Sequence, residues 1–244
     1  MSKIAVVAGG AKNLGGLISK SLGADGYGVV VHYNSPSTKE AALSTVHEIK
    51  SKQGQAWAVQ ADLTKVAKVE ELFAFAKDKG KVYLAVNTVG KVLKKPIAET
   101  SETDYDSMFN INSKAAFFFI KSAGAALEEG GSIVSIVTAL LAAFTPFYAT
   151  YQGSKAPVEF FTKSAAKELM EKKITVNAVA PGPMDTPFFY PQESDDAVAY
   201  HKSQGLGGRL TKIEDVLPLI KLLTTGQHWI TGQVIYTNGG YTAK

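Results

Sequence analysis

The sequence has no cysteine, and Arg209 is the only arginine among its 244 residues. Without cysteine the chain can form neither a disulfide bond nor a catalytic thiolate, and this composition fits a reducing compartment. We therefore predict a cytoplasmic protein. A single arginine also gives no arginine cluster of the kind that would bind an acyl carrier protein or coenzyme A.

Histidine is scarce as well, and nothing in the sequence indicates a metal site. The four histidines, His32, His47, His201 and His228, are scattered and form no His-x-x-x-His or Glu-x-x-His pair, the spacings that place two metal ligands on one helix face. The net charge is +4, but the lysines are spread along the chain among acidic residues. We interpret them as a solvated surface and expect no nucleic-acid partner.

Charged residues are missing from one long stretch, between Glu129 and Lys155. Its length would suffice for a membrane span. It contains glycine, serine, threonine, proline and two tyrosines, however, so we interpret it as a buried strand that leads into a functional loop. We predict no membrane span, and the apolar strand pattern at the start of the chain predicts no signal peptide.

Short runs of β-branched and aromatic residues alternate with longer amphipathic segments along the chain. The longer segments, such as 64–79 and 159–173, predict about six helices. The short runs predict strands at 4–8, 28–33, 56–61, 82–87, 132–138, 174–180 and 233–237. Four of these lack polar alternation, as parallel strands covered on both faces do. We predict an α/β fold over residues 1–244, a single doubly wound Rossmann-type domain with a seven-stranded parallel sheet and helices on both faces.

A glycine-rich turn, VVAGGAKNLGG at 6–16, joins the first predicted strand to the first helix. Such a turn lets the backbone approach a phosphate group, and the helix N-terminus adds unpaired N–H groups. Alone it is ambiguous, because glycine-rich turns also serve as plain connections. Its place after the first strand of an alternating chain favours nucleotide binding.

The second predicted strand ends without the acidic residue that an NAD-specific site usually places on the ribose hydroxyl. No acid occurs between Asp25 and Glu40. The donors available to a phosphate here are Lys12, Tyr33, Asn34 and Ser35. We predict NADPH as the cofactor rather than NADH, with the alternative that Asn34 and Ser35 only begin a turn.

Polar residues also follow the third and fourth predicted strands. Asp62, before Leu63, either accepts a hydrogen bond from an adenine amino group or caps the next helix. Asn87 ends the fourth strand, and Gly90 would allow a cofactor to approach closely. These residues lie at strand carboxyl ends, the edge where such sheets bind ligands.

The segment YATYQGSK, residues 148–155, contains two candidate proton donors. Tyr151 precedes Lys155 by four residues and Tyr148 by seven, and both spacings bring a phenol and an ammonium to one side of a helix. A phenol beside a buried lysine can be a proton donor near neutral pH. The spacing alone leaves open which tyrosine is the acid.

Together these motifs resemble the short-chain dehydrogenase/reductase family over essentially the whole chain. The residues that carry the resemblance are Gly9-x-x-x-Asn13-Leu14-Gly15, Asp62, Asn87-Thr88-Val89-Gly90, Asn112, Tyr151-x-x-x-Lys155 and PGPMDT at 181–186. The resemblance implies hydride transfer between a nicotinamide and a carbonyl or alcohol group.

The resemblance also implies roles for individual residues. Tyr151 would be the general acid, and Lys155 would hold the nicotinamide ribose and lower the pKa of the tyrosine. Asn112 would support a water-linked proton path to Lys155. The implied cofactor contacts, besides Tyr151 and Lys155, are Gly9, Asn13, Leu14, Asp62, Leu63, Asn87, Gly90, Pro181, Gly182 and Thr186.

The chain departs from the family at the catalytic serine, whose position is taken by Thr138. Threonine keeps the hydroxyl group, although its methyl group restricts χ1. We predict that Thr138 replaces the serine in catalysis and in binding the substrate. The alternative is a nucleotide-binding regulatory protein that has kept the fold and lost the chemistry.

A second alternative concerns Tyr148, whose spacing to Lys155 matches enoyl reductases of the same superfamily. The nucleotide turn lacks the longer insertion typical of those enzymes, and Thr138 is correctly spaced for Tyr151. We favour Tyr151 as the acid of a carbonyl reductase and Tyr148 as a substrate-pocket residue.

The proline- and glycine-containing loop at about 183–210 is too long for a simple connection and is predicted to bind the substrate. Its Phe188 and Phe189, with Phe144 and Tyr148 approaching from the other side, favour a hydrophobic or aromatic ketone or aldehyde.

Small and apolar residues at 115–127 and 152–171 suit helix packing between subunits. Here the resemblance implies a homotetramer.

Overall fold

The computed structural model describes residues 2–225 and 228–243 and is built on a seven-stranded parallel sheet. The strands are β1 (Lys3–Ala8), β2 (Gly28–Tyr33), β3 (Ala56–Gln60), β4 (Lys81–Asn87), β5 (Ser132–Ile136), β6 (Thr175–Pro181) and β7 (Val234–Thr237), in the order β3-β2-β1-β4-β5-β6-β7. The order reverses between β1 and β4, and such a switch point opens a ligand crevice at the carboxyl ends of the strands.

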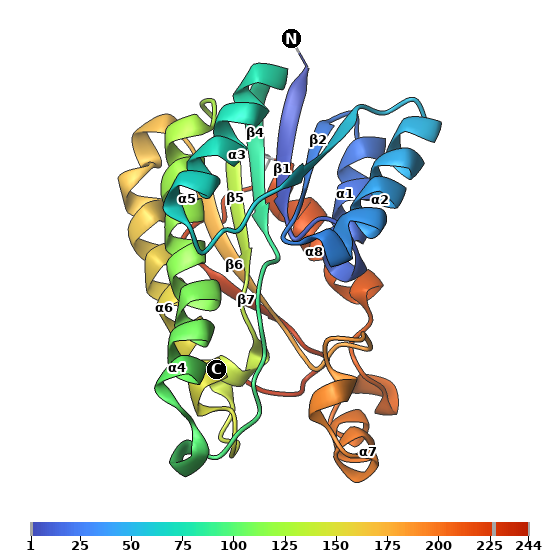
Figure 1. Ribbon diagram of the computed structural model, residues 1–244, viewed down its shortest axis with the longest axis vertical. Coiled ribbons are helices and arrows are strands. Elements are labelled where there is room, and N and C mark those ends of the chain that lie inside the picture. Colours follow the sequence, from blue (N-terminus) through green and yellow to red (C-terminus); the bar gives the residue numbers. More distant parts are fainter. Residues whose placement is uncertain (1, 226–227, 244) are drawn as a thin grey trace.

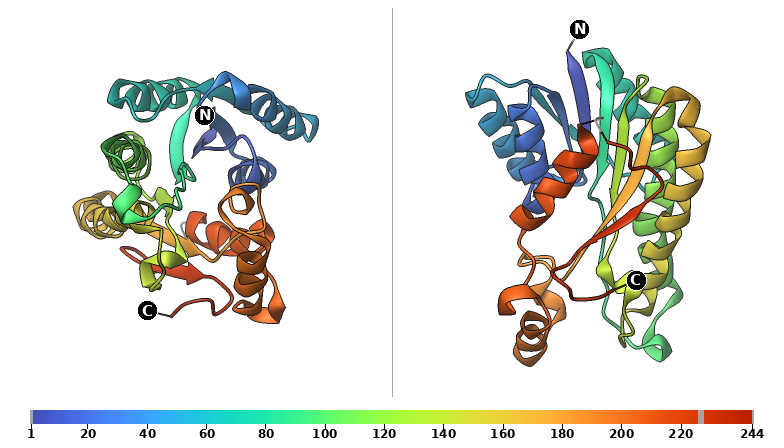
Figure 2. Two further views of the ribbon diagram at one scale, coloured as in Figure 1. Left: turned by 60° about the horizontal axis from the view of Figure 1, so that its bottom comes forward. Right: turned by 180° about the vertical axis from the view of Figure 1, so that it is seen from behind.

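Helices cover both faces of the sheet (Figures 1 and 2). The described residues form α1 (Asn13–Ala24), α2 (Lys39–Ser51), α3 (Val66–Lys79), α4 (Glu102–Phe109), α5 (Ala115–Ala126), α6 (Ala149–Glu168), α7 (Asp195–Ser203) and α8 (Ile213–Thr224). One apolar cluster joins the sheet to α1, α2 and α8, and a second joins it to α3, α5 and α6. In Figure 1, α7 and the start of α4 lie at the lower end, beyond the carboxyl ends of the strands.

The central strand β1 shows why the sheet needs both layers. Ile4, Val6 and Ala8 belong to the cluster under α3 and α5, whereas Ala5 and Val7 belong to the cluster under α1 and α2. All five side chains are fully buried. Because successive side chains of a strand point to opposite faces, a continuous apolar run is what a doubly covered strand requires.

The predicted fold class is confirmed, and the seven strands fall where the sequence predicted them within two residues at each end. The helices differ more. Eight are described instead of about six, and α6 begins at Ala149, ten residues before the predicted segment 159–173. Gly153 and Pro157 weaken the helical pattern there, but burial of Tyr151, Ser154 and Val158 stabilises the helix.

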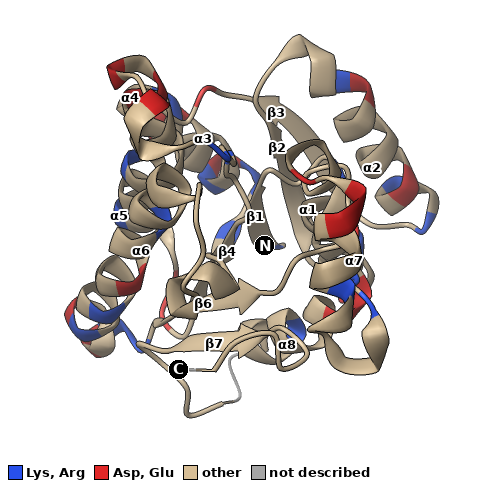
Figure 3. Cartoon of the chain, turned by 90° about the horizontal axis from the view of Figure 1, so that it is seen from below, with Lys and Arg blue, Asp and Glu red and all other residues tan. Residues whose placement is uncertain are grey.

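Charged residues lie mostly on the outer helices when the molecule is viewed along its strands (Figure 3), with both signs interspersed. No helix of the described residues is long and apolar enough to span a bilayer. Within the same residues, no group of three or more His, Cys, Asp or Glu side chains is placed to hold a metal ion.

Candidate active site

A cleft opens at the switch point between β1 and β4, and we call it the nucleotide cleft. Ten of the predicted cofactor residues line it: Gly9, Lys12, Asn13, Leu14, Tyr33, Asn34, Gly90, Tyr151, Lys155 and Thr186. Among all its lining residues in the described chain, three are lysines and none is acidic. The cleft therefore has the charge that a phosphorylated ligand requires.

The glycine-rich turn at the floor of the cleft is too tightly folded for larger residues. A Cβ atom on Gly15 would lie 2.2 Å from the carbonyl oxygen of Gly9, and Gly9 itself has a φ of +72°. Helix α1 then starts at Asn13 with no side-chain cap and no acidic residue in its first turn. Its first N–H groups remain available to a phosphate, so these residues fit a dinucleotide.

His32, which the sequence analysis did not single out, holds this turn in place. Its Nδ1 accepts a hydrogen bond from the Gly9 N–H at 3.0 Å, and its Nε2 lies 2.8 Å from the carbonyl oxygen of Ala61. This pairing requires a neutral ring with the proton on Nε2. Burial lowers the pKa of His32, which favours the same neutral form, so the ring connects the ends of β1, β2 and β3.

The polar residues at the end of β2 were predicted either to bind a phosphate or to begin a turn, and they differ in where they lie. Tyr33, Asn34 and Thr38 line the cleft, but Ser35 does not. The Ser35 hydroxyl instead contacts the Ser37 hydroxyl at 2.8 Å, and its backbone N–H faces Thr38 at 3.5 Å. Ser35 therefore takes part in a turn, and its predicted contact with the cofactor stays a prediction.

Three other predicted cofactor residues do not line the cleft in this structure. Asp62 accepts hydrogen bonds from the N–H and hydroxyl groups of Thr64, at 3.0 and 2.7 Å. Leu63 is buried in the core, and Asn87 accepts from the Val89 N–H at 3.0 Å. These side chains shape the turns after β3 and β4.

Tyr151, Lys155 and Thr138 meet where the end of β5 contacts α6. The Lys155 ammonium donates to the carbonyl oxygen of Ile136 at 2.9 Å and lies 3.4 Å from that of Val89. A Cβ atom on Gly90 would lie 3.0 Å from the Lys155 Nζ, so only glycine leaves the space beside the ammonium free. Thr138 lies close enough to the Tyr151 phenol to lower its pKa by hydrogen bonding, and both residues line the pocket described below.

The Thr138 hydroxyl has a defined orientation. Its oxygen accepts a hydrogen bond from the Leu140 N–H at 3.2 Å, as the cap of the short helical turn Ala139–Ala142. One lone pair is thereby used, and the hydroxyl proton is left to donate. Only 7 % of Thr138 is exposed, and the residue lines the pocket described below.

Burial shifts the pKa values of both groups on α6. It raises the pKa of the Tyr151 phenol to about 12, although the hydrogen bond with Thr138 acts in the opposite direction. Burial also lowers the pKa of the Lys155 ammonium to about 8. The two groups therefore carry opposite shifts one helical turn apart, a pattern typical of functional sites.

Asn112 is positioned by a π-helical turn, Asn110–Lys114, between α4 and α5. Its amide accepts from the Lys91 N–H and donates to the Lys91 carbonyl, both at 2.8 Å, and donates to the Ser154 hydroxyl at 2.9 Å. Asn112 thus ties the loop after β4 to α6. Its predicted part in a proton path stays a prediction.

A second cavity, the substrate pocket, adjoins the cleft beneath the segment after β6. Of the predicted residues, Thr138, Tyr148, Tyr151, Pro181, Gly182, Thr186, Phe188 and Phe189 line it. Pro181 and Gly182 thus face this pocket rather than the nucleotide cleft. Phe144, predicted as a substrate contact, lies outside the lining because its side chain is fully exposed.

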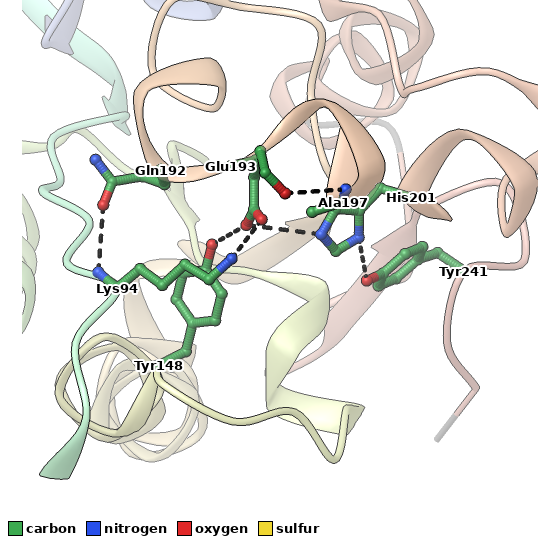
Figure 4. Close-up of polar contacts among 8 residues, drawn as sticks. Lys94, Tyr148, Gln192, Glu193, Ala197, His201 and Tyr241 are labelled. Carbon is green, nitrogen blue, oxygen red and sulfur yellow. Dashed lines mark hydrogen bonds and ion pairs between the residues drawn. The ribbon is translucent and has the colours of Figure 1, made fainter. Parts of the chain in front are cut away.

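One end of the substrate pocket holds a polar cluster that the sequence analysis missed (Figure 4). The Glu193 carboxylate pairs with the Lys94 ammonium at 2.5 Å and accepts a hydrogen bond from the Tyr148 hydroxyl. His201 Nε2 lies 3.6 Å from Glu193, and His201 Nδ1 lies 2.7 Å from the Tyr241 hydroxyl. In the sequence, the aromatic residues of the same loop give a stronger signal than its single glutamate and histidine.

Comparison with known proteins is consistent with this geometry. Residues 9–242 match a family model described as enoyl-(acyl carrier protein) reductase. A hydroxynaphthalene reductase-like protein of Metarhizium robertsii is 36 % identical, over 98 % of this chain and 94 % of its own. An NADPH-dependent aldehyde reductase-like chloroplast protein of Arabidopsis thaliana is 33 % identical, with the same coverage of both chains.

Solved structures also match over nearly the whole chain. A protein from Burkholderia cenocepacia, solved with bound NADP, is 55 % identical with a TM-score of 0.96, over 100 % of this chain and 94 % of its own. A blue fluorescent protein from a metagenomic library, in complex with NADPH, is 30 % identical with a TM-score of 0.92, over 99 % of this chain and 98 % of its own. The chain belongs to the short-chain dehydrogenase/reductase family of oxidoreductases.

Proposed function

We propose that this protein is an NADPH-dependent reductase that converts a ketone or aldehyde to an alcohol. One observation carries the proposal: Tyr151 lines both the nucleotide cleft and the substrate pocket, while Lys155 lines only the cleft and Thr138 only the pocket. The candidate acid thus stands where the two ligands would meet, with a cationic neighbour on one side and a hydroxyl donor on the other.

The cofactor is NADPH, as in the solved relatives that contain NADP or NADPH. When bound, it supplies the hydride. The free N–H groups of α1 and the Lys12 ammonium would bind its phosphates, and Asn34 and Thr38 would face its ribose. The lack of acidic residues in the cleft lining supports the choice of NADPH over NADH.

The chain's own residues would move the proton. Thr138, whose oxygen already accepts from Leu140, would donate to the carbonyl oxygen and orient it. Tyr151 would then transfer its hydroxyl proton to that oxygen. The Lys155 ammonium, one turn along α6, favours this transfer because its positive charge stabilises the phenolate that remains.

Tyr148 is less suited to be the acid. Its hydroxyl donates to the Glu193 carboxylate, and burial together with this negative charge holds the pKa of Tyr148 well above its usual value. A proton directed at a carboxylate is withheld from a substrate. This observation supports a carbonyl reductase over an enoyl reductase that would use Tyr148.

Aromatic side chains on the pocket wall, Phe188 and Phe189, support a hydrophobic or aromatic substrate.

Replacing each tyrosine with phenylalanine tests the assignment. We expect Tyr151→Phe to lower kcat by about 10²–10⁴-fold, because the positioned proton donor is lost. Tyr148→Phe keeps Tyr151 and serves as the matched control; it should act mainly on KM. Both variants are assayed with NADPH and an aryl ketone, and circular dichroism checks their folding. Loss of turnover in Tyr148→Phe with normal turnover in Tyr151→Phe would reverse the assignment.

The reduction rate should also depend on pH through Lys155. Its ammonium has a pKa of about 8, so it is charged below that pH and neutral above it. Since the charge assists proton release from Tyr151, kcat/KM for reduction should be constant near neutral pH and fall above about pH 8. The measurement is a profile between about pH 6 and 10 with folding monitored at each point. A profile that stays flat across this range contradicts the role given to Lys155.

Cofactor preference can be altered at the end of β2. Asn34→Asp adds a carboxylate to the cleft lining, where it would repel a 2′-phosphate, so kcat/KM for NADPH relative to NADH should fall by at least about tenfold. Ser37→Asp adds the same charge at an exposed position outside the lining and is the control. Equal preference for the two cofactors in the unmodified protein would refute the cofactor assignment.

We further propose a homotetramer that assembles through α5 and α6. Phe117 on α5 and Phe160 on α6 are exposed large apolar side chains, 44 % and 67 % accessible in the single chain, and burial between subunits would remove this surface from water. Light scattering should give the mass of four chains, and Phe160→Glu should lower it. A monomer at micromolar concentration would disprove the assembly.

A further inference from the structure

The substrate pocket has a chemically distinct end at Glu193. Much of its wall is apolar, with Val92, Leu140 and Phe189 among the lining residues, yet the Glu193 carboxylate also lines it with a side chain only 1 % exposed. A buried carboxylate is costly unless its oxygens are paired. The partners of the two Glu193 oxygens therefore determine which ligand groups this end of the pocket can bind.

The partners of Glu193 leave part of its hydrogen-bonding capacity unused. One oxygen, Oε2, faces the Lys94 ammonium, and the other, Oε1, accepts from the Tyr148 hydroxyl. Each carboxylate oxygen has about two acceptor sites. Glu193, which lines the pocket together with Tyr148, His201 and Tyr241, therefore has capacity for a further hydrogen bond from a donor there. Figure 4 shows its carboxylate between Tyr148 and His201.

His201 lies beside the same oxygen but not within hydrogen-bond distance. Its Nε2 is 3.6 Å from Oε1, while its Nδ1 is 2.7 Å from the Tyr241 hydroxyl. With the Tyr241 hydroxyl donating to Nδ1, Nε2 carries the ring proton and lies toward Glu193 Oε1, on a residue that also lines the pocket. Glu193 Oε1 is thus an acceptor and His201 Nε2 a donor, and the 3.6 Å between them is longer than a direct hydrogen bond.

A hydroxyl group is the ligand that matches this pair, because it donates one hydrogen bond and accepts another. A carboxylate would be repelled by Glu193. An ammonium would compete with Lys94, which already balances the charge of Glu193. A methoxy group or hydrocarbon would leave the remaining acceptor site of Glu193 buried and unused, which costs free energy.

The position of this subsite relative to the chemistry follows from the two tyrosine rings. The Tyr148 and Tyr151 ring centroids are 6.2 Å apart, and the Tyr148 hydroxyl reaches Glu193. The Tyr148 ring therefore links the proton donor to the polar end of the pocket. A substrate whose carbonyl group meets Tyr151 would extend along this ring toward Glu193.

We propose that Glu193 and His201 form a hydroxyl-binding subsite, so that the substrate is an aromatic ketone or aldehyde that carries a hydroxyl group on the side away from its carbonyl. This inference rests on the proposed carbonyl reductase function. Glu193 and His201 would then determine specificity, without taking part in the proton transfer to the carbonyl.

The test compares α-tetralone with its ring-hydroxylated derivatives and with the matching methoxy compounds, each with NADPH. We expect at least one hydroxylated ketone to exceed both its methoxy analogue and α-tetralone in kcat/KM by about 10- to 100-fold, the effect of a hydrogen bond to a charged acceptor. The methoxy series controls for ring electronics, and α-tetralone, which lacks the substituent, controls for a steric clash of the larger methoxy group. Turnover of all compounds with equal kcat/KM would overturn the subsite while leaving the reductase function intact.

Three variants assign the preference to the subsite. Glu193→Gln and His201→Leu should each lower the hydroxyl-to-methoxy ratio at least about fivefold, whereas His201→Gln, which keeps an N–H donor, should retain more of it than His201→Leu. Because the ratio is taken within one variant, a displaced loop that slows both substrates does not alter it. An unchanged ratio in both Glu193→Gln and His201→Leu would overturn the assignment.

If no ketone is reduced, the proposed reductase function fails, and binding still decides the subsite. Calorimetric titration of the NADP complex with the same compounds should show tighter binding of a hydroxylated ketone than of its methoxy analogue. Equal affinities for each such pair would overturn the subsite.

Discussion

The hydrogen bond from the Lys155 ammonium to the carbonyl oxygen of Ile136 is the contact on which the site depends. It fixes α6 against the end of β5, so that Tyr151, one turn earlier on α6, faces Thr138, two residues beyond Ile136. The ammonium is 95 % buried and its described partners are carbonyl oxygens rather than a carboxylate. Desolvation is therefore left uncompensated by an opposite charge, and the pKa of Lys155 falls to about 8.

The second buried charge of the site is handled in the opposite way. Glu193 is paired with Lys94 and the Tyr148 hydroxyl, so its charge is compensated where it lies. These contacts also join the segment before α7 to the loop after β4 and to the start of α6, across 99 and 45 residues of sequence. The candidate site therefore contains two buried charges in different environments. Lys155, near Tyr151, has no carboxylate partner among the described residues, whereas Glu193, at the other end of the substrate pocket, is paired with Lys94.

The sequence predicted what depends on local pattern or on short motifs. Continuous apolar runs identified the buried strands, and Tyr151 and Lys155 are close in space because they are four residues apart on one helix. Contacts between distant segments left no such signal. His32 bonds to a turn 23 residues away, and the partners of Glu193 come from two other parts of the chain. Phe144 illustrates the converse, since an aromatic residue near a site in sequence can still point into solvent.

Thr138 departs from the family pattern at the position of the catalytic serine, and its surroundings suit the role proposed for it. A serine hydroxyl can rotate among three rotamers, whereas the β-branched threonine has a restricted χ1. The Leu140 N–H occupies one lone pair of the Thr138 oxygen and leaves the hydroxyl proton free to donate. The restricted χ1 of threonine and this backbone contact act in the same direction, because both limit the orientations of a hydroxyl group that the proposed reaction needs as a fixed donor.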